Sequence, residues 1–460
     1  MALSSERQRE LMLTEQPGKL LLKKAVPTVV TQLITIIYNT ADTYFVAQIS
    51  TEASAAVGIV FSLMAIIQAL GFGIGMGANS LISRALGAKE DDKANVYASS
   101  ALVGGLFFGC FILTFGLIFL HPFMRLLGSS ENVLPFANEY ATYILIAAPF
   151  MCMAFVLNNL LRSQGQAFFS MIGMATGGIL NMFFDPLLIF TFHMGIRGAA
   201  IATMAGQIIS AGIMLGFFLK GKSIVRLGFR YISRKFSTYV LILRIGLPTI
   251  FRQGLASLAT AILNNQTAAY GDAAVAAISI VNKIYMLSRN IVLGIGQGYQ
   301  PIAGYCFGAG NKKRVKTFFW LSTAAGTTVV ILIAISVFLF RENIMTWFRD
   351  DPEVIRIGTE GLLYTCIVTP LMGFSTYANQ TYQVLGFSAG ATFLASCRQG
   401  IFYIPLAFIL PAIAGLTGIE LLQPAADLLT FIVAIPFVVW LFRHRLSENT
   451  GEFRETKNNL

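Results

Sequence analysis

Long runs of apolar residues dominate the chain, and short polar stretches separate them. A helix needs roughly 20 mostly apolar residues to cross the hydrocarbon core of a bilayer. Because no polar stretch is long enough to form a separate soluble domain, the pattern predicts an all-α integral membrane protein. Twelve segments are long and apolar enough to be transmembrane helices: 22–46, 54–83, 97–120, 136–161, 168–191, 198–219, 240–269, 274–306, 315–340, 355–384, 389–413 and 417–442.

The composition agrees with lipid as the main solvent. Hydrophobic residues make up 55% of the 460 positions and charged residues only 12%, against about 25% charged in soluble proteins. This excludes most enzyme and ATPase classes, and we expect no enzymatic activity. The five cysteines have no paired spacing and the three histidines are scattered, so we expect free thiols, no metal site and no cofactor.

The distribution of Lys and Arg predicts the orientation in the membrane. Most of the 33 basic residues lie in the tails and in the loops on the same side as the tails. Since cytosolic loops collect Lys and Arg, both termini are predicted to be cytosolic. The net charge of +11 follows from this asymmetry, and no nucleic-acid partner is needed to explain it. The loops on the other side hold only Arg125, Arg197, Arg341, Arg349 and Arg356.

The two halves of the chain repeat each other at a constant offset of 221 residues, as between Pro27 and Pro248. The run GIGMG at 73–77 matches GIGQG at 294–298, and we interpret these glycines as a close-packing or hinge surface. Six crossings per half make the repeat parallel, with its pseudo-twofold axis along the membrane normal. We therefore predict two six-helix bundles, the N-lobe and the C-lobe. The predicted divisions are a cytosolic tail at 1–21, the N-lobe at 22–219, a linker at 220–239, the C-lobe at 240–442 and a cytosolic tail at 443–460.

Two carboxylates lie within predicted helices of the N-lobe, and ionisable residues there indicate a functional site by default. Asp42 follows YNTA in the first helix, and Asp185 ends LNMFFD in the fifth. Asn181 lies one helical turn before Asp185 and on the same face. Burial and a second carboxylate nearby both favour the protonated form of a carboxyl group, so the pair is predicted to exchange protons. The alternative is that both aspartates sit at outer helix ends in contact with water.

Several motifs together resemble the multidrug and toxic compound extrusion (MATE) family of the MOP superfamily. They are YNxxDT in the first helix, GxGMGxxxxISRxLGAK at 73–89, NxLLRSQG at 158–165 and LNxxxDPLLIF at 180–190. The aspartates resemble those of the DinF-like bacterial branch. The NorM-like branch instead carries acids in the seventh and tenth helices, where this chain has Gln253 and no interior acid.

The resemblance implies a twelve-helix secondary active exporter, an antiporter in the bacterial inner membrane that confers antibiotic resistance. Its two lobes would rock to give alternating access, and its cargo would be small, amphipathic and usually cationic organic molecules. The coupling ion would be a proton, with sodium as the alternative, and we expect a monomer. By position, the cation-coupling network would comprise Asp42, Asn181, Asp185, Thr203, Tyr143 and Asn158. Helix 1 would bend at Pro27.

The C-lobe carries a different set of membrane-embedded charges. Arg252, Lys283, Arg289 and Arg398 lie in predicted helices, and Asp427 is the only deep acid of that lobe. An ion pair with Asp427 would neutralise only one cation; the other interpretation is a basic cavity wall that accepts anionic or zwitterionic substrates. The full set of substrate-cavity candidates is Gln32, Tyr38, Met151, Phe155, Arg252, Gln253, Lys283, Arg289 and Arg398.

Other functional classes remain as alternatives. A lipid-linked oligosaccharide flippase of the same superfamily fits the intramembrane arginines, but such flippases commonly carry additional helices. A major-facilitator carrier also has twelve helices, yet its signature loop after the second helix is absent. A sensor or channel lacks support, because neither a receptor domain nor a selectivity filter is visible.

Overall fold

The computed structural model describes residues 5–447, and every regular element in that range is helical. Eleven of the described helices are long and apolar enough to cross a membrane. The remaining long helix, α9 (Phe236–Ala268), has 33 residues but carries Arg244 and Arg252, and its composition is less apolar. Each of the twelve predicted membrane segments thus corresponds to a helix or to consecutive helical pieces.

The first bundle contains the helices up to the linker. Its central helix α6 is mostly buried among the others, as expected for a helix surrounded by protein rather than lipid. The elements are α2 (Pro17–Ala47), α3 (Thr51–Gly87), α4 (Asp91–Ile118), α5 (Leu120–Leu126), α6 (Leu134–Ser163), α7 (Ala167–Pro186), the π turn η1 (Leu187–Thr191) and α8 (Gly195–Leu219).

The second bundle follows the linker, which contains the short turn η2 (Phe229–Tyr231). Two of its membrane segments are interrupted, one by the 3₁₀ turn η3 (Thr369–Leu371) and one by the π turn η4 (Cys397–Ile401). Besides α9 its helices are α10 (Asp272–Gly308), α11 (Lys312–Leu339), α12 (Arg341–Phe348), α13 (Pro352–Val368), α14 (Met372–Val384), α15 (Ser388–Ser396), α16 (Tyr403–Glu420) and α17 (Leu422–His444).

Four predicted helix ends are wrong by five to seven residues, and one of them is the start of α4, which begins at Asp91 instead of residue 97. α2 begins at Pro17 instead of residue 22, because proline is well accommodated in a first helical turn. The eleventh membrane segment continues to Glu420 instead of ending at 413, so α17 begins at Leu422 instead of 417. Gly415 adopts a φ of 61° and kinks this segment, but the chain resumes its helical path afterwards.

The residues before α2 were predicted to be a tail, yet residues 5–14 fold into the helix α1 (Ser5–Thr14). Met12 of α1 is completely buried. The Arg9 side chain donates from Nε to the Gly87 carbonyl oxygen at 2.7 Å. On the other side, Arg314 of α11 donates from Nε to the Met12 carbonyl oxygen at 3.3 Å. α1 therefore contacts both bundles. Residues 1–4 and 448–460 of the predicted tails lie outside the described range.

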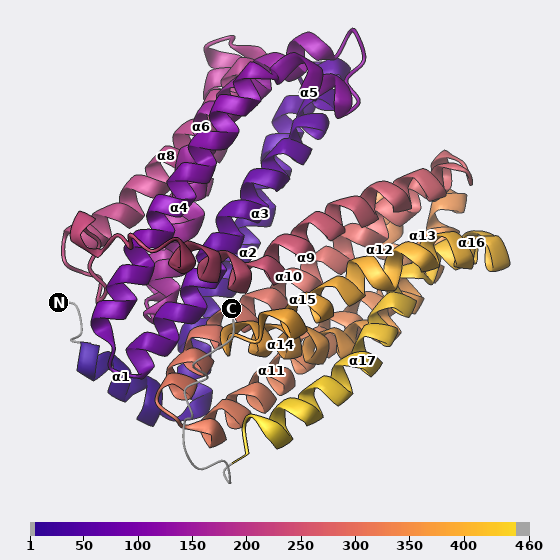
Figure 1. The fold of residues 1–460 in the computed structure, drawn as a ribbon. Coiled ribbons are helices and arrows are strands. Elements are labelled where there is room, and N and C mark those ends of the chain that lie inside the picture. Colours follow the sequence, from indigo (N-terminus) through magenta and orange to yellow (C-terminus); the bar gives the residue numbers. More distant parts are fainter. Residues whose placement is uncertain (1–4, 448–460) are drawn as a thin grey trace.

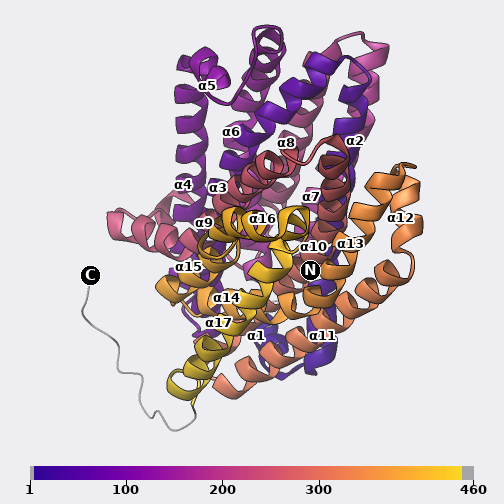
Figure 2. The same ribbon diagram turned by 90° about the vertical axis from the view of Figure 1, so that its right-hand side faces the viewer.

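The two bundles meet at the end that carries α1 and diverge toward the end that carries α5 and α12 (Figure 1). The perpendicular view shows the same arrangement, with α1 and α5 at opposite ends (Figure 2). We call the α1 side the closed end and the α5 side the open end. Helices that lie far apart in sequence thus share one contact region at the closed end.

Glycines of both halves form the contact between the bundles. A Cβ atom on Gly246 of α9 would overlap the backbone of Gly73 in α3, and one on Gly298 of α10 would overlap Ala25 in α2. Only glycine allows backbones to approach this closely. The predicted close-packing role of the two glycine runs is confirmed. One polar contact reinforces it, because Thr28 donates from Oγ1 to the Gly294 carbonyl oxygen at 2.6 Å.

Candidate functional site

Four helices of the first bundle bring polar side chains together in its interior. Asn181 of α7 donates from Nδ2 to Asp185 Oδ1 at 3.3 Å and faces Thr203 Oγ1 of α8 at 3.4 Å. Asp185 has no exposed surface, and Asn181 and Thr203 are buried. Asp42 of α2 is half-buried. The water-exposed alternative is therefore wrong for Asp185.

Tyr140 of α6 completes this group, which we call the N-lobe cluster: Asp42, Tyr140, Asn181, Asp185 and Thr203. The Tyr140 side chain is fully buried and in electrostatic contact with Asp42 and Asp185. Oδ1 of Asp42, Oδ2 of Asp185, Oδ1 of Asn181 and the Tyr140 hydroxyl oxygen are buried without a hydrogen-bond partner among the described residues. Three of these four atoms can only accept while the carboxyl groups are ionised, and the Tyr140 hydroxyl is the one that can also donate. A proton on one carboxyl group would supply a donor where these acceptors lack one.

Other N-lobe residues predicted for the coupling network lie elsewhere. Asn158 donates from Nδ2 to Ser170 Oγ at 2.6 Å, which joins α6 to α7. The Tyr143 ring lies 5.5 Å from the Arg197 guanidinium. Neither residue has a hydrogen bond to the N-lobe cluster in residues 5–447.

The remaining N-lobe candidates have mixed surroundings. Tyr38 lies in electrostatic contact with Asp42 one helical turn away, so it borders the cluster. Met151 and Phe155 are buried, and the Phe155 ring packs against Phe72 at 4.8 Å. Gln32 is half-buried on α2.

Pro27 is buried within α2, one residue before the cross-bundle contact of Thr28. It lacks an N–H, so one helical hydrogen bond is missing at this point. This places a weak point of the helix beside the closed-end contact.

A polar pocket in the second bundle collects three of the predicted cations. Arg252 of α9, Arg289 of α10 and Arg398 of η4 line it. They lie close enough to repel one another electrostatically. The other lining residues are polar, small or apolar: Ala256, Leu293, Ser375, Thr376, Asn379, Leu394, Ala395, Gln399 and Thr430. We call this the arginine pocket.

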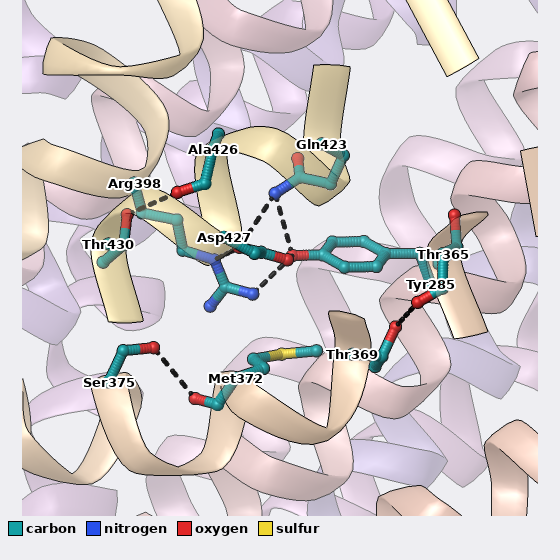
Figure 3. Close-up of polar contacts among 10 residues, drawn as sticks. All are labelled: Tyr285, Thr365, Thr369, Met372, Ser375, Arg398, Gln423, Ala426, Asp427 and Thr430. Carbon is teal, nitrogen blue, oxygen red and sulfur yellow. Dashed lines mark hydrogen bonds and ion pairs between the residues drawn. The ribbon is translucent and has the colours of Figure 1, made fainter. Parts of the chain in front are cut away.

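Asp427 of α17 neutralises one of these arginines. Arg398 Nε donates to Asp427 Oδ1 at 2.7 Å, and Tyr285 donates from its hydroxyl to Asp427 Oδ2 at 2.8 Å. Gln423 donates from Nε2 to the same carboxylate at 3.1 Å. Figure 3 shows the Arg398 guanidinium, the Asp427 carboxylate and the Tyr285 phenol joined by these contacts. No ion pair or hydrogen bond of the Arg252 or Arg289 side chain occurs within residues 5–447.

Two predicted cavity residues of the C-lobe lie outside the lining of the arginine pocket. Lys283 is exposed on α10, and Gln253 is half-buried on α9.

Sequence reasoning missed Tyr140, Tyr285 and Gln423. Tyr140 lies three residues before Tyr143 on α6, and the resemblance to the family pointed to Tyr143 instead. A tyrosine or glutamine in an apolar run signals a buried partner, but the partner is defined only by packing.

Comparison with known proteins gives one family and close relatives. The sequence model of the family described as MatE matches residues 27–187 and 248–409, once in each half. The multidrug export protein MepA of Staphylococcus aureus strain MSSA476 is 28% identical over 438 residues, which cover 95% of this chain and 96% of the relative. MepA of Staphylococcus saprophyticus is 27% identical over 432 residues, 94% of this chain and 95% of the relative.

Solved structures show the same fold. An outward-facing multidrug resistance transporter of the MATE family has a TM-score of 0.88 at 24% identity, with 94% of this chain and 97% of that chain covered. A MOP superfamily transporter from Pyrococcus furiosus, described as having a binding pocket of reverse polarity, also has a TM-score of 0.88 at 24% identity. The match covers 95% of this chain and 98% of that chain.

Proposed function

The chain belongs to the MatE family of multi-pass membrane transporters, and we propose that it exports small amphipathic organic molecules by proton-coupled antiport. It is a transporter and not an enzyme. The bacterial relatives named as multidrug export proteins support an efflux function. They also support a location in the bacterial cytoplasmic membrane, and we propose that the transporter acts there as a monomer.

The N-lobe cluster is the observation that carries the proposed coupling mechanism. Asp185 is fully buried, and one oxygen of each carboxyl group has no hydrogen-bond partner in residues 5–447. A buried carboxylate with an unsatisfied oxygen is unfavourable, and a bound proton removes that penalty. In the proposed mechanism the cluster takes up protons in one conformation and releases them in the other.

Coupling requires that the two conformations differ in proton affinity, because a ligand with equal affinity for both shifts nothing. α2 supplies Asp42 to the cluster and Thr28 to the contact with Gly294. Protonation near one end of α2 is thereby connected to the closed-end contact near its other end. We propose that α2 changes shape at Pro27 as the lobes 22–219 and 240–442 rock.

The proposed topology places both termini in the cytosol, so the closed end is cytosolic and the open end faces outward. The Lys and Arg distribution supports this orientation. The arrangement would then be the state that releases cargo outside the cell.

Transport by purified protein in proteoliposomes tests the coupling. We expect Asp42→Asn and Asp185→Asn to abolish substrate movement driven by a pH gradient, whereas Asp92→Asn, which makes the same change at an exposed position of α4, stays active. A sodium gradient imposed at constant pH separates the two candidate ions. Normal proton-driven export by the Asp42→Asn, Asp185→Asn double variant would refute the mechanism.

A further inference from the structure

The arginine pocket carries more positive charge than the surrounding protein neutralises. Three guanidinium groups line it, and one of them, Arg398, is paired with Asp427. No acidic residue is among those that line the pocket, and Asp427 reaches Arg398 from outside the lining. Neither Arg252 nor Arg289 has an ion pair within residues 5–447, and the charges of the arginines repel one another; Asp427 offsets Arg289 only through its electrostatic field, without an ion pair.

Such an arrangement is costly inside a membrane protein unless something compensates for it. Charged groups at membrane depth normally pair with one another or serve a transport pathway. Arg398 is paired with Asp427, and it also donates to the Tyr285 hydroxyl, which Gln423 contacts as well (Figure 3). Arg252 and Arg289 are free to take an incoming anion.

The chemistry of the lining fits an acidic group attached to an apolar body. A guanidinium binds carboxylate or phosphate through two parallel N–H donors. Ser375 and Thr376 add hydroxyl groups beside the arginines, while Leu293 and Leu394 supply apolar walls. The three guanidinium groups would repel a cationic group placed here.

We propose that the arginine pocket binds the carboxylate or phosphate of an amphipathic substrate, so that the exported molecules are anionic or zwitterionic. This inference rests on the proposed export function and specifies its substrate class. Arg252 and Arg289 contact the acidic group, and Arg398 is a positioning residue held by Asp427. The pocket lies in the lobe opposite the N-lobe cluster, so substrate and proton occupy separate sites.

Equilibrium binding to the full chain in phosphatidylcholine nanodiscs tests the proposal without any ion gradient. Three fluorescent probes of similar size differ in charge: N-dansyl-phenylalanine carries a carboxylate, its amide is neutral, and dansylcadaverine is a cation. Because a charge-assisted hydrogen bond contributes strongly, we expect the carboxylate probe to bind about tenfold more tightly than the amide. Equal binding of the acid and the amide, or tighter binding of the cation, would overturn the proposal.

Substitutions locate the binding to the pocket. Arg252→Gln and Arg289→Gln should each remove most of the preference for the acid. Arg349→Gln, which removes the same charge at an exposed position of the same lobe, should keep it. Asp427→Asn should tighten binding of the acid, because it frees Arg398. A preference that survives the Arg252→Gln, Arg289→Gln double variant would contradict the assignment.

Two further readouts keep the interpretation unambiguous. If an arginine variant fails to fold, the comparison of acid and amide on the unmodified protein still decides the question. Nanodiscs with added phosphatidylglycerol test a lipid headgroup as the occupant, and displacement of the acid probe by this lipid would overturn a substrate role. Selective acid binding without proton-driven export would refute only the proposed coupling, whereas coupled export without acid preference would refute only this inference.

Discussion

Asn158 and Asn379 occupy equivalent positions in the two halves and make the same kind of contact. Asn158 donates from Nδ2 to the Ser170 carbonyl oxygen at 3.4 Å, and Asn379 donates to the Ala391 carbonyl oxygen at 2.5 Å. Each bond ties a long helix to the next one along the chain. The positions of the C-lobe that correspond to Asp42 and Asp185 carry no acid. Because the asparagine bond occurs in both lobes, it does not depend on the aspartates, which indicates a structural role for Asn158.

The structural role predicts that Asn158→Ala and Asn379→Ala behave alike. In each variant a buried carbonyl oxygen loses its hydrogen-bond donor, which lowers the free energy of unfolding by about 1–3 kcal/mol. We expect a lower thermal unfolding temperature in detergent for both variants and unchanged proton dependence of transport per folded molecule. Asn181→Ala, within the N-lobe cluster, should lose the proton dependence. An Asn158→Ala protein of normal stability that no longer couples would contradict this assignment.

The sequence was sufficient to find most residues of the two sites but not their partners. Asp42, Asp185 and the arginines were visible because charges in apolar segments are rare. Asp427 was the only candidate partner for four cations. That it pairs with Arg398 depends on how η4 and α17 pack. The convergence of α9, α10 and η4 around one pocket likewise follows from tertiary structure alone.

At the scale of elements, hydropathy predicted the twelve membrane segments, since lipid demands continuous apolar length. The segments that contain η3 and η4 were predicted as continuous because these interruptions are only 3 and 5 residues long and leave the surrounding apolar run recognisable. α1 was not predicted, for a different reason. It is short and polar, and only Met12 and Gln8 are buried. The segment therefore contains no apolar run that would predict a helix.

α1 is expected to stabilise the closed end because it contacts both lobes. Truncating a buried methionine costs about 2–5 kcal/mol, so Met12→Ala should loosen the helix and lengthen the distance between the ends of α3 and α10. Spin labels on Ala88→Cys and Ala309→Cys, in a chain with its five native cysteines replaced, measure that distance by pulsed electron resonance.

Glu10→Ala provides the control for this measurement, because Glu10 is exposed on the same helix. It should leave the distance distribution unchanged. An unaltered distribution in Met12→Ala would mean that α1 merely lies on the closed end without holding it.

At the scale of the whole molecule, the repeat gives the closed end two related contacts. Gly73 of α3 meets Gly246 of α9, and Gly298 of α10 meets Ala25 of α2. These contacts are backbone against backbone, so they tolerate no added atom. The balance between conformations should therefore depend on side-chain volume here more than on any single hydrogen bond.

Gly246→Ala tests this dependence directly, because its new methyl group would overlap the Gly73 carbonyl group. Overpacking of this kind costs about 1–3 kcal/mol. The cost applies only to the conformation in which the lobes touch. The conformation with a separated closed end therefore gains population. Gly254→Ala is the matched control on α9, since a methyl group there meets open space. The same spin-label pair at residues 88 and 309 should report longer distances in Gly246→Ala and unchanged distances in Gly254→Ala. If both variants keep the original distances, the glycine contact does not govern the opening of the two lobes.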